Sequence, residues 1–444
     1  MTALSDHQER NSRVPEHIVE AIDAGVETIY YQVVTLSGKL MAKISPARQL
    51  VRNLENGILM HRSAVADFHT SLSGELLGGG PAAPEFQAIP DMDTFTVLPW
   101  DPKAARFLCS LYEPDHRPGI GGAPFAADPR GHLRRVHDDF RQRTGMELRT
   151  GCEPEMTWLG EGLEVHSRPG ENPSYEFEQL ERMRPIYQQL IRYATHFGLE
   201  MIEGDYEDAG QLELNWMFDA AELTADRLVT YRMICRQVAR EFGVTASFMP
   251  KIAPGVMGTG CHHNVSLWRD DVNAFCDPGR GDLHLTPVAR HALGGMLAHA
   301  TESMVVMGST VNSYKRYWDV GQFAPTQIDW GMEDKTCTVR LSGNGRLEYK
   351  LPDSAVNPYL SHALLIAQIE DGLANEIDPD SVSVQTIPRT LGEAVQLFAE
   401  GKFVKASLTP ELASVLIALK SDEWARYCGA VTDWEREMYL TVGQ

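Results

Sequence analysis

Two segments of the chain place carboxylates on stretches that are otherwise apolar and suited to β-strands. Residues 151–159 read GCEPEMTWL, and residues 346–353 read RLEYKLPD. Glu153 and Glu155 are two residues apart, so on a strand both side chains leave by the same face. Two carboxylates about 4 Å apart repel by about 4 kcal/mol at an effective dielectric constant of about 20. A fold tolerates this repulsion when a cation or a proton lies between them.

Further ligand types indicate a metal ion rather than a shared proton. Acids recur at Glu207, Glu213 and Glu348, and His262 and His263 form a histidine pair. Hard oxygen ligands with one imidazole suit Mg²⁺ or Mn²⁺ better than zinc. One such acid alone is most often a solvated loop charge, but the recurrence of these acids beside glycine and apolar strands favours a metal site.

The segment YEDAGQLELN at 206–215 supplies two of these acids. Gly210 permits a close approach of the backbone, and Glu213 is expected to point into the site from the start of a strand. Glu207 is placed to reach the same cation from the preceding loop. Asp205 is an alternative to Glu207 for that role.

Glycines and arginines near these acids are suited to anions. The glycine-rich turn GTGCHHNVSL at 258–267 can present backbone N–H groups to a phosphate. Arg316 in NSYKR and Arg340 in TVRL can each bind two oxygens of a carboxylate or phosphate, although structural ion pairs are an equal alternative. Together with the acids, these features predict phosphoryl transfer from a metal–nucleotide complex to a carboxylate. The chain has neither a GxxxxGK[ST] motif nor a kinase signature set.

Length and charge narrow the class of protein. A chain of 444 residues should form about two domains, and its formal charge of −21 argues against nucleic-acid or anionic-membrane partners. No apolar run is long enough for a membrane span, and the polar N-terminus lacks a signal-peptide core. Seven cysteines without CxxC spacing predict reduced thiols in a cytoplasm. Cys152, Cys261 and Cys337 lie beside predicted site residues, and we interpret them as small buried thiols.

The expected organisation is α+β, with a small sheet domain at 1–102 and a larger domain at 103–444. In the first, a helix ends near Gly25, and strands at 29–34 and 40–44 flank a hairpin turn at Ser37-Gly38-Lys39. A further strand is expected at 94–98. In the second, Asp128 caps a helix that has Pro129 in its first turn. Other elements are expected as strands at 107–112, 212–218 and 336–341 and as helices at 176–196, at 224–242 and from Tyr359 onward.

Six separated segments, in this order, resemble the glutamine synthetase family: GCEPEMTWL, YEDAGQLELN, GTGCHHNVSLW, NSYKR, TVRL and RLEYKLPDSAVNPYL. The resemblance extends from about Ile29 to the C-terminus. It implies a small N-terminal β-grasp domain and a catalytic α/β domain with a curved antiparallel sheet and flanking helices. It also implies a homo-oligomer of stacked hexameric rings, a dodecamer, with active sites between subunits. The implied chemistry is phosphorylation of the γ-carboxylate of L-glutamate by ATP, followed by attack of a nitrogen nucleophile.

The resemblance assigns roles residue by residue. It implies that the first metal ion is bound by Glu155, Glu207 and Glu213, and the second by Glu153, His262 and Glu348. Arg316 resembles the arginine that holds the substrate carboxylate, and Arg340 one that neutralises the transferring phosphoryl group. Positions that match the glutamate site are Gly258, His262, Arg316 and Lys350. Positions that match the nucleotide site are Phe218, Asn264, Ser266, Lys335 and Arg340.

Three positions depart from the family pattern near the phosphates. Asn264 stands where a second histidine is usual. Lys335 and Lys350 stand where the family has arginines, and each keeps a point charge but loses the bidentate fork.

The nitrogen site departs further. Residues 321–325 read GQFAP where ammonia-using members carry a glutamate in a GYEAP-like turn, and residues 66–70 read ADFHT instead of a DGSS pattern. Asp67 is the counterpart of an aspartate that reaches the ammonium site across the subunit interface. A less anionic, more apolar pocket suits a small alkylamine, with methylamine as the first choice.

Other functions stay open at this point. Within the family these are synthesis of glutamine from ammonia, or ligation of a larger amine or polyamine, for which Asp67 and Asp319 could contribute charge. A guanidino kinase and a catalytically inactive structural homologue are the alternatives from other classes. Retention of all the predicted metal acids speaks against the inactive homologue.

Overall fold

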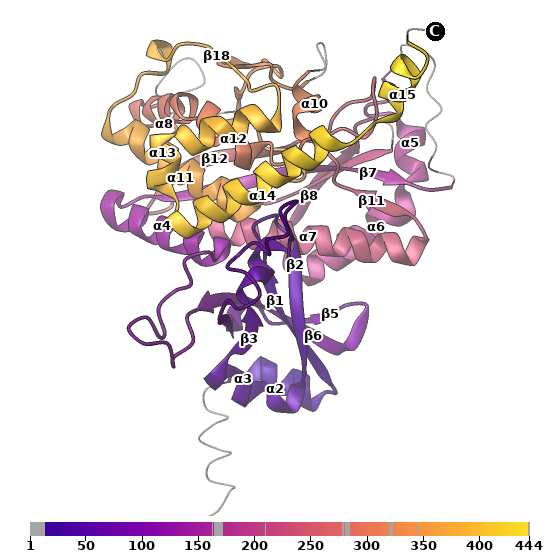
Figure 1. Ribbon diagram of the computed structural model, residues 1–444, viewed down its shortest axis with the longest axis vertical. Coiled ribbons are helices and arrows are strands. Elements are labelled where there is room, and N and C mark those ends of the chain that lie inside the picture. The colour runs from indigo at the N-terminus through magenta and orange to yellow at the C-terminus, as the bar shows by residue number, and fades with distance from the viewer. Residues whose placement is uncertain are drawn as a thin grey trace, which may run out of the picture.

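The computed structural model describes residues 14–161, 163, 172–208, 210–277, 279, 285–318, 323–343 and 345–442. Figure 1 shows a smaller N-terminal part, in indigo, below a larger part that contains the remaining strands and most helices. The long helix α14 (Pro410–Gly429) crosses the front of the larger part, and the short helix α15 (Asp433–Tyr439) follows it near the C-terminus. The fold is mixed α and β, as the sequence predicts.

The N-terminal sheet has the strand order β2-β1-β6-β4-β3, and β5 pairs with β6. The predicted hairpin is confirmed, because β1 and β2 pair antiparallel around Gly38. β1 and β6 are parallel neighbours, so the sheet is mixed, in agreement with the predicted β-grasp domain. Helices α2 (Glu16–Asp23) and α3 (Leu50–Asn56) contribute to its core. The strands are β1 (Thr28–Val34), β2 (Leu40–Pro46), β3 (Ile58–His61), β4 (Glu85–Pro90), β5 (Thr96–Leu98) and β6 (Asp101–Tyr112).

The predicted domain boundary at residue 102 is wrong in detail. It cuts β6, whose residues 104–108 pair with β1 and whose residues 109–112 pair with β4. The N-terminal sheet therefore extends to Tyr112. The strand expected at 107–112 is the second half of this longer strand. The prediction failed because Asp101, Pro102 and Lys103 read as a break, whereas the backbone stays extended through them.

The larger sheet has the strand order β15-β16-β17-β12-β7-β9-β8. Neighbours along it are antiparallel except β15 and β16. Its main strands are β7 (Glu147–Leu159), β8 (Met201–Tyr206), β9 (Gln211–Trp216), β12 (Cys261–Arg269), β15 (Trp330–Met332), β16 (Val339–Gly343) and β17 (Arg346–Tyr349). Short strands at its margins are β10 (Asp219–Ala220), β11 (Thr245–Ser247) and β13 (Val272–Asn273). A separate pair joins β14 (Gln327–Ile328) to β18 (Gln385–Thr386).

Helices cover one face of this sheet and seal its core. The packing helices include α7 (Ala221–Phe242), α11 (Pro358–Ala374), α4 (Pro129–Thr144) and α8 (Pro287–Ala298). Alternate residues of β7 enter the core, among them Met156 and Trp158. Their neighbours Glu153 and Glu155 face the other way, which is the period-two pattern expected of a strand. The remaining helices are α5 (Phe177–Arg182), α6 (Arg184–His196), α9 (Met304–Met307), α10 (Ser313–Tyr317), α12 (Leu391–Glu400) and α13 (Lys402–Ser407).

Two expected elements differ from the structure. The single helix expected at 176–196 is broken into α5 and α6, because Pro185 starts a new helix after Met183. The strand expected at 336–341 begins only at Val339, after a turn in which Asp334 accepts hydrogen bonds from Thr336. Among the described residues, no helix has both the length and the apolar character that crossing a membrane would need.

Candidate active site

Strand register gathers the predicted acids. Glu155 in β7 lies directly opposite Glu213 in β9, and Glu213 lies opposite Asp205 in β8. On the other side of β7, Glu153 lies opposite His262 in β12. Residues that face each other across a ladder share one side of the sheet. Acids that are far apart in the sequence therefore converge on one surface.

The strand β17 completes this surface. Glu348 lies opposite Asn264 of β12 on one side and opposite Arg340 of β16 on the other. Arg340 Nη1 is 2.9 Å from Glu348 Oε2. A basic group thus stands next to a buried acid that the sequence assigned to the metal set.

A cavity of about 370 Å³ lies over this surface. The predicted residues that line it are Glu153, Glu155, Glu207, Glu213, Gly258, His262, Arg316, Lys335, Arg340, Glu348 and Lys350. Further lining residues include Asp205, Tyr175, Met257, Phe323 and Ala324. The structure therefore brings eleven predicted side chains or backbone positions together around one space.

One group of three ligands is closely spaced. Ligand atoms of Glu153, His262 and Glu348 all lie within 4.8 Å of one another. His262 Nδ1 is 3.3 Å from Glu153 Oε2 and 3.5 Å from Glu348 Oε1. Burial, followed by the nearby charge of Lys350, holds the pKa of His262 well below its usual value. The imidazole is then neutral, which is the form that binds metals.

The other three predicted ligands crowd negative charge together. Burial is the main cause that raises the pKa of Glu155, Glu207 and Glu213. For Glu207 the pKa rises to about 8, and the next largest cause is the charge of Glu155. Glu155 accepts a hydrogen bond from the backbone N–H of Gly260 at 2.6 Å. Without a cation, these carboxylates hold protons or repel one another.

Asp205 is placed differently from Glu207. The acid that most raises the pKa of Asp205 by its charge is Glu203, and Glu153 follows. Glu207 instead feels Glu155 first and Asp205 next, and Glu213 feels Glu153, Glu155 and Glu207. Glu207 is therefore close to both Glu155 and Glu213, and Asp205, which lies opposite Glu213, stays an alternative.

The lining as a whole fits divalent cations. Among the described residues it contains seven carboxylates and five lysine or arginine side chains, so acids are in excess. The oxygens and the single neutral imidazole are hard or intermediate donors, which suit Mg²⁺ or Mn²⁺. Burial of these acids without a compensating ion would be costly. The residues present therefore fit the predicted metal ions.

Two basic side chains are held rigidly beside the acids. Arg316 is buried and donates to the backbone oxygens of Leu351 at 3.2 Å and Lys350 at 3.0 Å. Lys350 Nζ is 3.4 Å from Glu348 Oε1, and burial lowers its pKa. Fixed cations of this kind can orient an anionic substrate without rearrangement.

A second cavity, of about 330 Å³, adjoins the first and shares Glu153 with it. It is lined by Phe218, Asn264 and Ser266, as predicted for a nucleotide site. Its wall also contains Trp268, which was not among the predicted site residues. The Phe218 and Trp268 rings stack with centroids 5.7 Å apart.

The second cavity is suited to a flat, partly apolar group. The guanidinium of Arg149 lies 4.7 Å from the centroid of the Trp268 ring and extends the stack. Asn264 Nδ2 donates to Glu153 Oε1 at 2.7 Å, which links the two cavities. The tryptophan that ends GTGCHHNVSLW was the available signal, because it follows Ser266 at the spacing of two that shares a strand face.

Asp67 does not line the cavity of its own chain among the described residues. It lies in the N-terminal domain with a left-handed φ of 57°. It accepts a hydrogen bond from Ser37, and its Oδ2 is 3.4 Å from Lys39 Nζ. Its role at a neighbouring subunit stays a prediction. Asp319, Gly321 and Gln322 lie outside the described residues.

Four apolar or aromatic side chains contribute to the lining of the first cavity. Phe323 and Ala324, from the GQFAP segment, line it together with Met257 and Tyr175. Tyr175 has a left-handed φ of 63° and is 65% exposed, so its ring stands at the rim. Lys335 Nζ lies 5.2 Å from the centroid of the Phe323 ring. No periodic pattern marks Met257 or Tyr175 in the sequence, since both lie in loops.

Comparisons with known proteins agree with this architecture. Residues 126–439 match the family described as the glutamine synthetase catalytic domain. The glutamine synthetase of Rhizobium meliloti (strain 1021) is 30% identical over 446 residues, covering 95% of this chain and 98% of that protein. The glutamine synthetase of Methanosarcina mazei is 30% identical over 465 residues, covering 98% and 99%.

Solved structures give the same result. A structure of a GmaS/ADP complex superposes with a TM-score of 0.84 at 30% identity, covering 95% of this chain and 99% of that chain. A ligand-free GmaS structure superposes with a TM-score of 0.83 at 30% identity, covering 96% and 99%.

Proposed function

This chain belongs to the glutamine synthetase family, and within that family we propose that it is an ATP-dependent ligase that joins L-glutamate to a small amine. The proposed products are a γ-glutamylamide, ADP and phosphate, with methylamine as the preferred amine. This is the activity of a γ-glutamylmethylamide synthetase. The similarity to GmaS structures over nearly the whole chain supports the proposal.

The metal roles follow from the grouping of the acids. We assign Glu155, Glu207 and Glu213 to one divalent ion, and the closely spaced Glu153, His262 and Glu348 to a second. Bound there, Mg²⁺ or Mn²⁺ would neutralise phosphate charge and align the phosphoryl group for transfer.

The nucleotide role follows from the second cavity. Phe218 and Trp268 offer aromatic surface to a purine base, and Ser266 lies in the same wall. The second cavity is lined by Asn264, and the first by Lys335 and Arg340. We assign these three side chains to binding the phosphates of ATP. This arrangement directs the tail of ATP towards the acids.

The glutamate role follows from the buried cations. Arg316, beside His262 and Gly258, is assigned to binding a carboxylate of glutamate. Lys350 is assigned to the γ-carboxylate, which accepts the phosphoryl group. In the first step a γ-carboxylate oxygen attacks the terminal phosphorus, and the bond from that phosphorus to ADP breaks. In the second step the amine nitrogen attacks the acyl carbon, phosphate leaves, and the nitrogen loses a proton. Arg340 is suited to stabilise the charge of the transferring group.

The choice of amine is supported by apolar side chains in the lining of the first cavity. Phe323 stands within the segment where ammonia-using relatives carry a glutamate, and Ala324, Met257 and Tyr175 line the same cavity. An alkyl group can contact this surface, whereas ammonium finds one acid fewer. One methyl group contributes about 1–3 kcal/mol of discrimination. Ammonia should therefore remain a poor substrate.

The observation that carries the proposal is that the acid-lined cavity and the aromatic cavity adjoin at Glu153. The test is steady-state kinetics with L-glutamate, ATP and Mg²⁺ against ammonium, methylamine, ethylamine, isopropylamine and putrescine. We expect the highest kcat/KM with methylamine. A higher kcat/KM with ammonium would contradict the choice of amine and favour glutamine synthesis, the function named for the two curated relatives.

The same assay separates the remaining alternatives. A preference for putrescine would indicate a polyamine ligase. If no amine supports ADP release, and ATP with Mg²⁺ does not raise Tm, the chain is an inactive homologue. For the active site between subunits, we propose that Asp67 of a neighbouring copy approaches the amine, which requires a ring-shaped homo-oligomer.

A further inference from the structure

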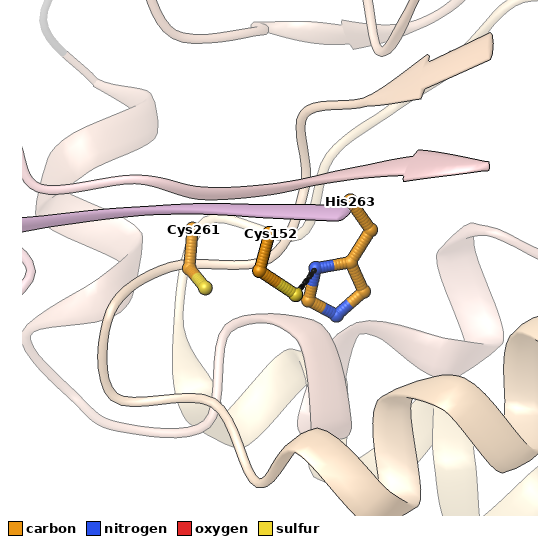
Figure 2. A group of neighbouring side chains, drawn as sticks. All are labelled: Cys152, Cys261 and His263. Atoms are coloured by element: carbon orange, nitrogen blue, oxygen red, sulfur yellow. Dashed lines mark hydrogen bonds between the residues drawn. The ribbon is translucent and has the colours of Figure 1, made fainter. Parts of the chain in front are cut away.

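A second cluster of ligating side chains lies behind the active site. Cys152 in β7 and Cys261 and His263 in β12 are all buried. Their sulfur and nitrogen ligand atoms lie within 4.8 Å of one another. Figure 2 shows the Cys152 sulfur directed at the His263 ring, with Cys261 beside it. The Cys152 Sγ to His263 Nδ1 distance is 3.5 Å.

His263 is held in position from its far side. Its Nε2 is 2.8 Å from Ser361 Oγ, and its ring stacks on His362 with centroids 4.4 Å apart. A hydrogen bond at one ring nitrogen fixes the ring so that the other nitrogen faces a ligand position. Here the other nitrogen, Nδ1, faces the Cys152 sulfur.

A buried cation lies close to the two thiols. Arg232 is 5% exposed and donates to two neutral carbonyl oxygens, those of Val356 at 2.8 Å and Ser354 at 2.9 Å. Among the described residues its Nε has no hydrogen-bond partner. Cys261, Asp353 and Cys152 are the groups whose negative charge would act on it. A buried guanidinium favours negative groups nearby, and Asp353 is one, so deprotonated thiols would add to a compensation that a carboxyl group already provides.

We propose that Cys152, Cys261 and His263 form a three-coordinate site for a thiophilic monovalent metal ion, namely Cu(I). On binding, both thiols release their protons to solvent, and the metal forms bonds to two sulfurs and to His263 Nδ1. No electron is transferred. The complex carries one negative charge, which Arg232 offsets.

The two faces of these strands select different ions. Thiolate and imidazole ligands suit both Cu(I) and zinc, but structural zinc sites have four ligands and this cluster offers three, which favours Cu(I). Carboxylates instead favour Mg²⁺ and Mn²⁺. A hard ion on the front face therefore does not compete for the rear site. Because the three ligands are buried, we expect uptake to require local opening of the fold.

The test uses the full-length protein with Cys276→Ser and Cys428→Ser as the parent, since these are its two less buried cysteines. Cu(I) is supplied without oxygen during refolding and then competed with a coloured Cu(I) chelator. We expect one equivalent to be retained by the parent. Adding C152S and C261S should weaken retention at least 100-fold. Adding C337S instead, at a buried cysteine outside the cluster, should leave retention unchanged.

X-ray absorption spectroscopy of the Cu(I)-loaded parent protein identifies the ligands directly, without substituting any of them. A first shell of two sulfurs and one nitrogen supports the proposal. A shell without two sulfurs, retention of Cu(I) by the C152S/C261S protein, or no retention by the refolded parent would each overturn it.

Discussion

The two faces of strands β7 and β12 share one backbone but differ in the charge of their side chains and in what covers them. The front face carries Glu153, Glu155 and His262 and opens into a cavity. The rear face carries Cys152 and His263 and is sealed by helices. Successive residues of each strand therefore point into different environments, because side chains alternate between the two faces of a strand. The difference indicates that changes to the front should affect chemistry, and changes to the rear should affect stability.

The largest effect is expected from removing one front-face acid. Glu213→Gln should lower kcat by about 10³-fold, because it deletes a proposed metal ligand. The protein should not lose stability, since the substitution also removes repulsion from Glu153 and Glu155. Kinetics over a range of Mg²⁺ concentrations would check the loss of kcat, and Tm would check that stability is kept. Glu200→Gln, at an exposed acid that lines neither cavity, is the control.

A rear-face truncation should do the reverse. Met156→Ala removes a fully buried side chain from β7 and should destabilise the fold by about 2–5 kcal/mol. The KM for glutamate and the Mg²⁺ dependence of the folded enzyme should stay within about twofold. Urea unfolding and kinetics below the transition measure these quantities. If Met156→Ala changed the metal dependence as strongly as Glu213→Gln, the two faces would not be independent.

The choice of nitrogen substrate should respond to Phe323, an apolar residue in the lining of the front-face cavity. Phe323→Glu restores an acid in this segment and should raise kcat/KM for ammonium relative to methylamine by about tenfold. Phe323→Leu keeps the position apolar and should retain the preference for methylamine. An unchanged ratio in Phe323→Glu would place the amine elsewhere.

The smallest expected effect is a pH dependence of metal stabilisation. Glu207 has a pKa raised to about 8 in the folded protein, above its usual 4.5. The ion-free fold therefore keeps a proton that the unfolded chain releases, and its stability falls as pH rises towards 8. A bound divalent ion replaces this proton, so the rise in Tm caused by Mg²⁺ should be larger at pH 8 than at pH 6. In Glu207→Gln the difference between the two pH values should shrink.

Local patterns predicted much of the structure. The spacing of Glu153 and Glu155 predicted a shared strand face, and Asp128 with Pro129 predicted the start of α4. The β1–β2 hairpin followed from its turn residues. In each case the signal lies within a few residues and depends only on backbone geometry.

Long-range pairing could not be predicted in the same way. Nothing local specifies that Glu213 faces Glu155, because this register depends on how β9 packs beside β7. The spacing from Ser266 could have placed Trp268 on the same strand face, but nothing local specifies that its ring stacks on Phe218, which is distant in sequence. The extension of β6 across residue 102 also depends on pairing, since Asp101 pairs with Leu98 of β5 and residues 104–108 pair with β1.

Gly260 donates its backbone N–H to Glu155. A glycine is needed here because there is no room for a side chain, not because of an unusual backbone conformation. Its φ is not positive, but a Cβ at this position would lie 2.6 Å from His262 Nε2. The same atom would lie 3.1 Å from Arg316 Nη2 and 3.1 Å from Glu155 Oε1. A hydrogen atom at this position keeps open a hollow between an imidazole, a guanidinium and a carboxylate. Even alanine, the most conservative replacement, would therefore place a methyl group where the imidazole, the guanidinium and the carboxylate meet.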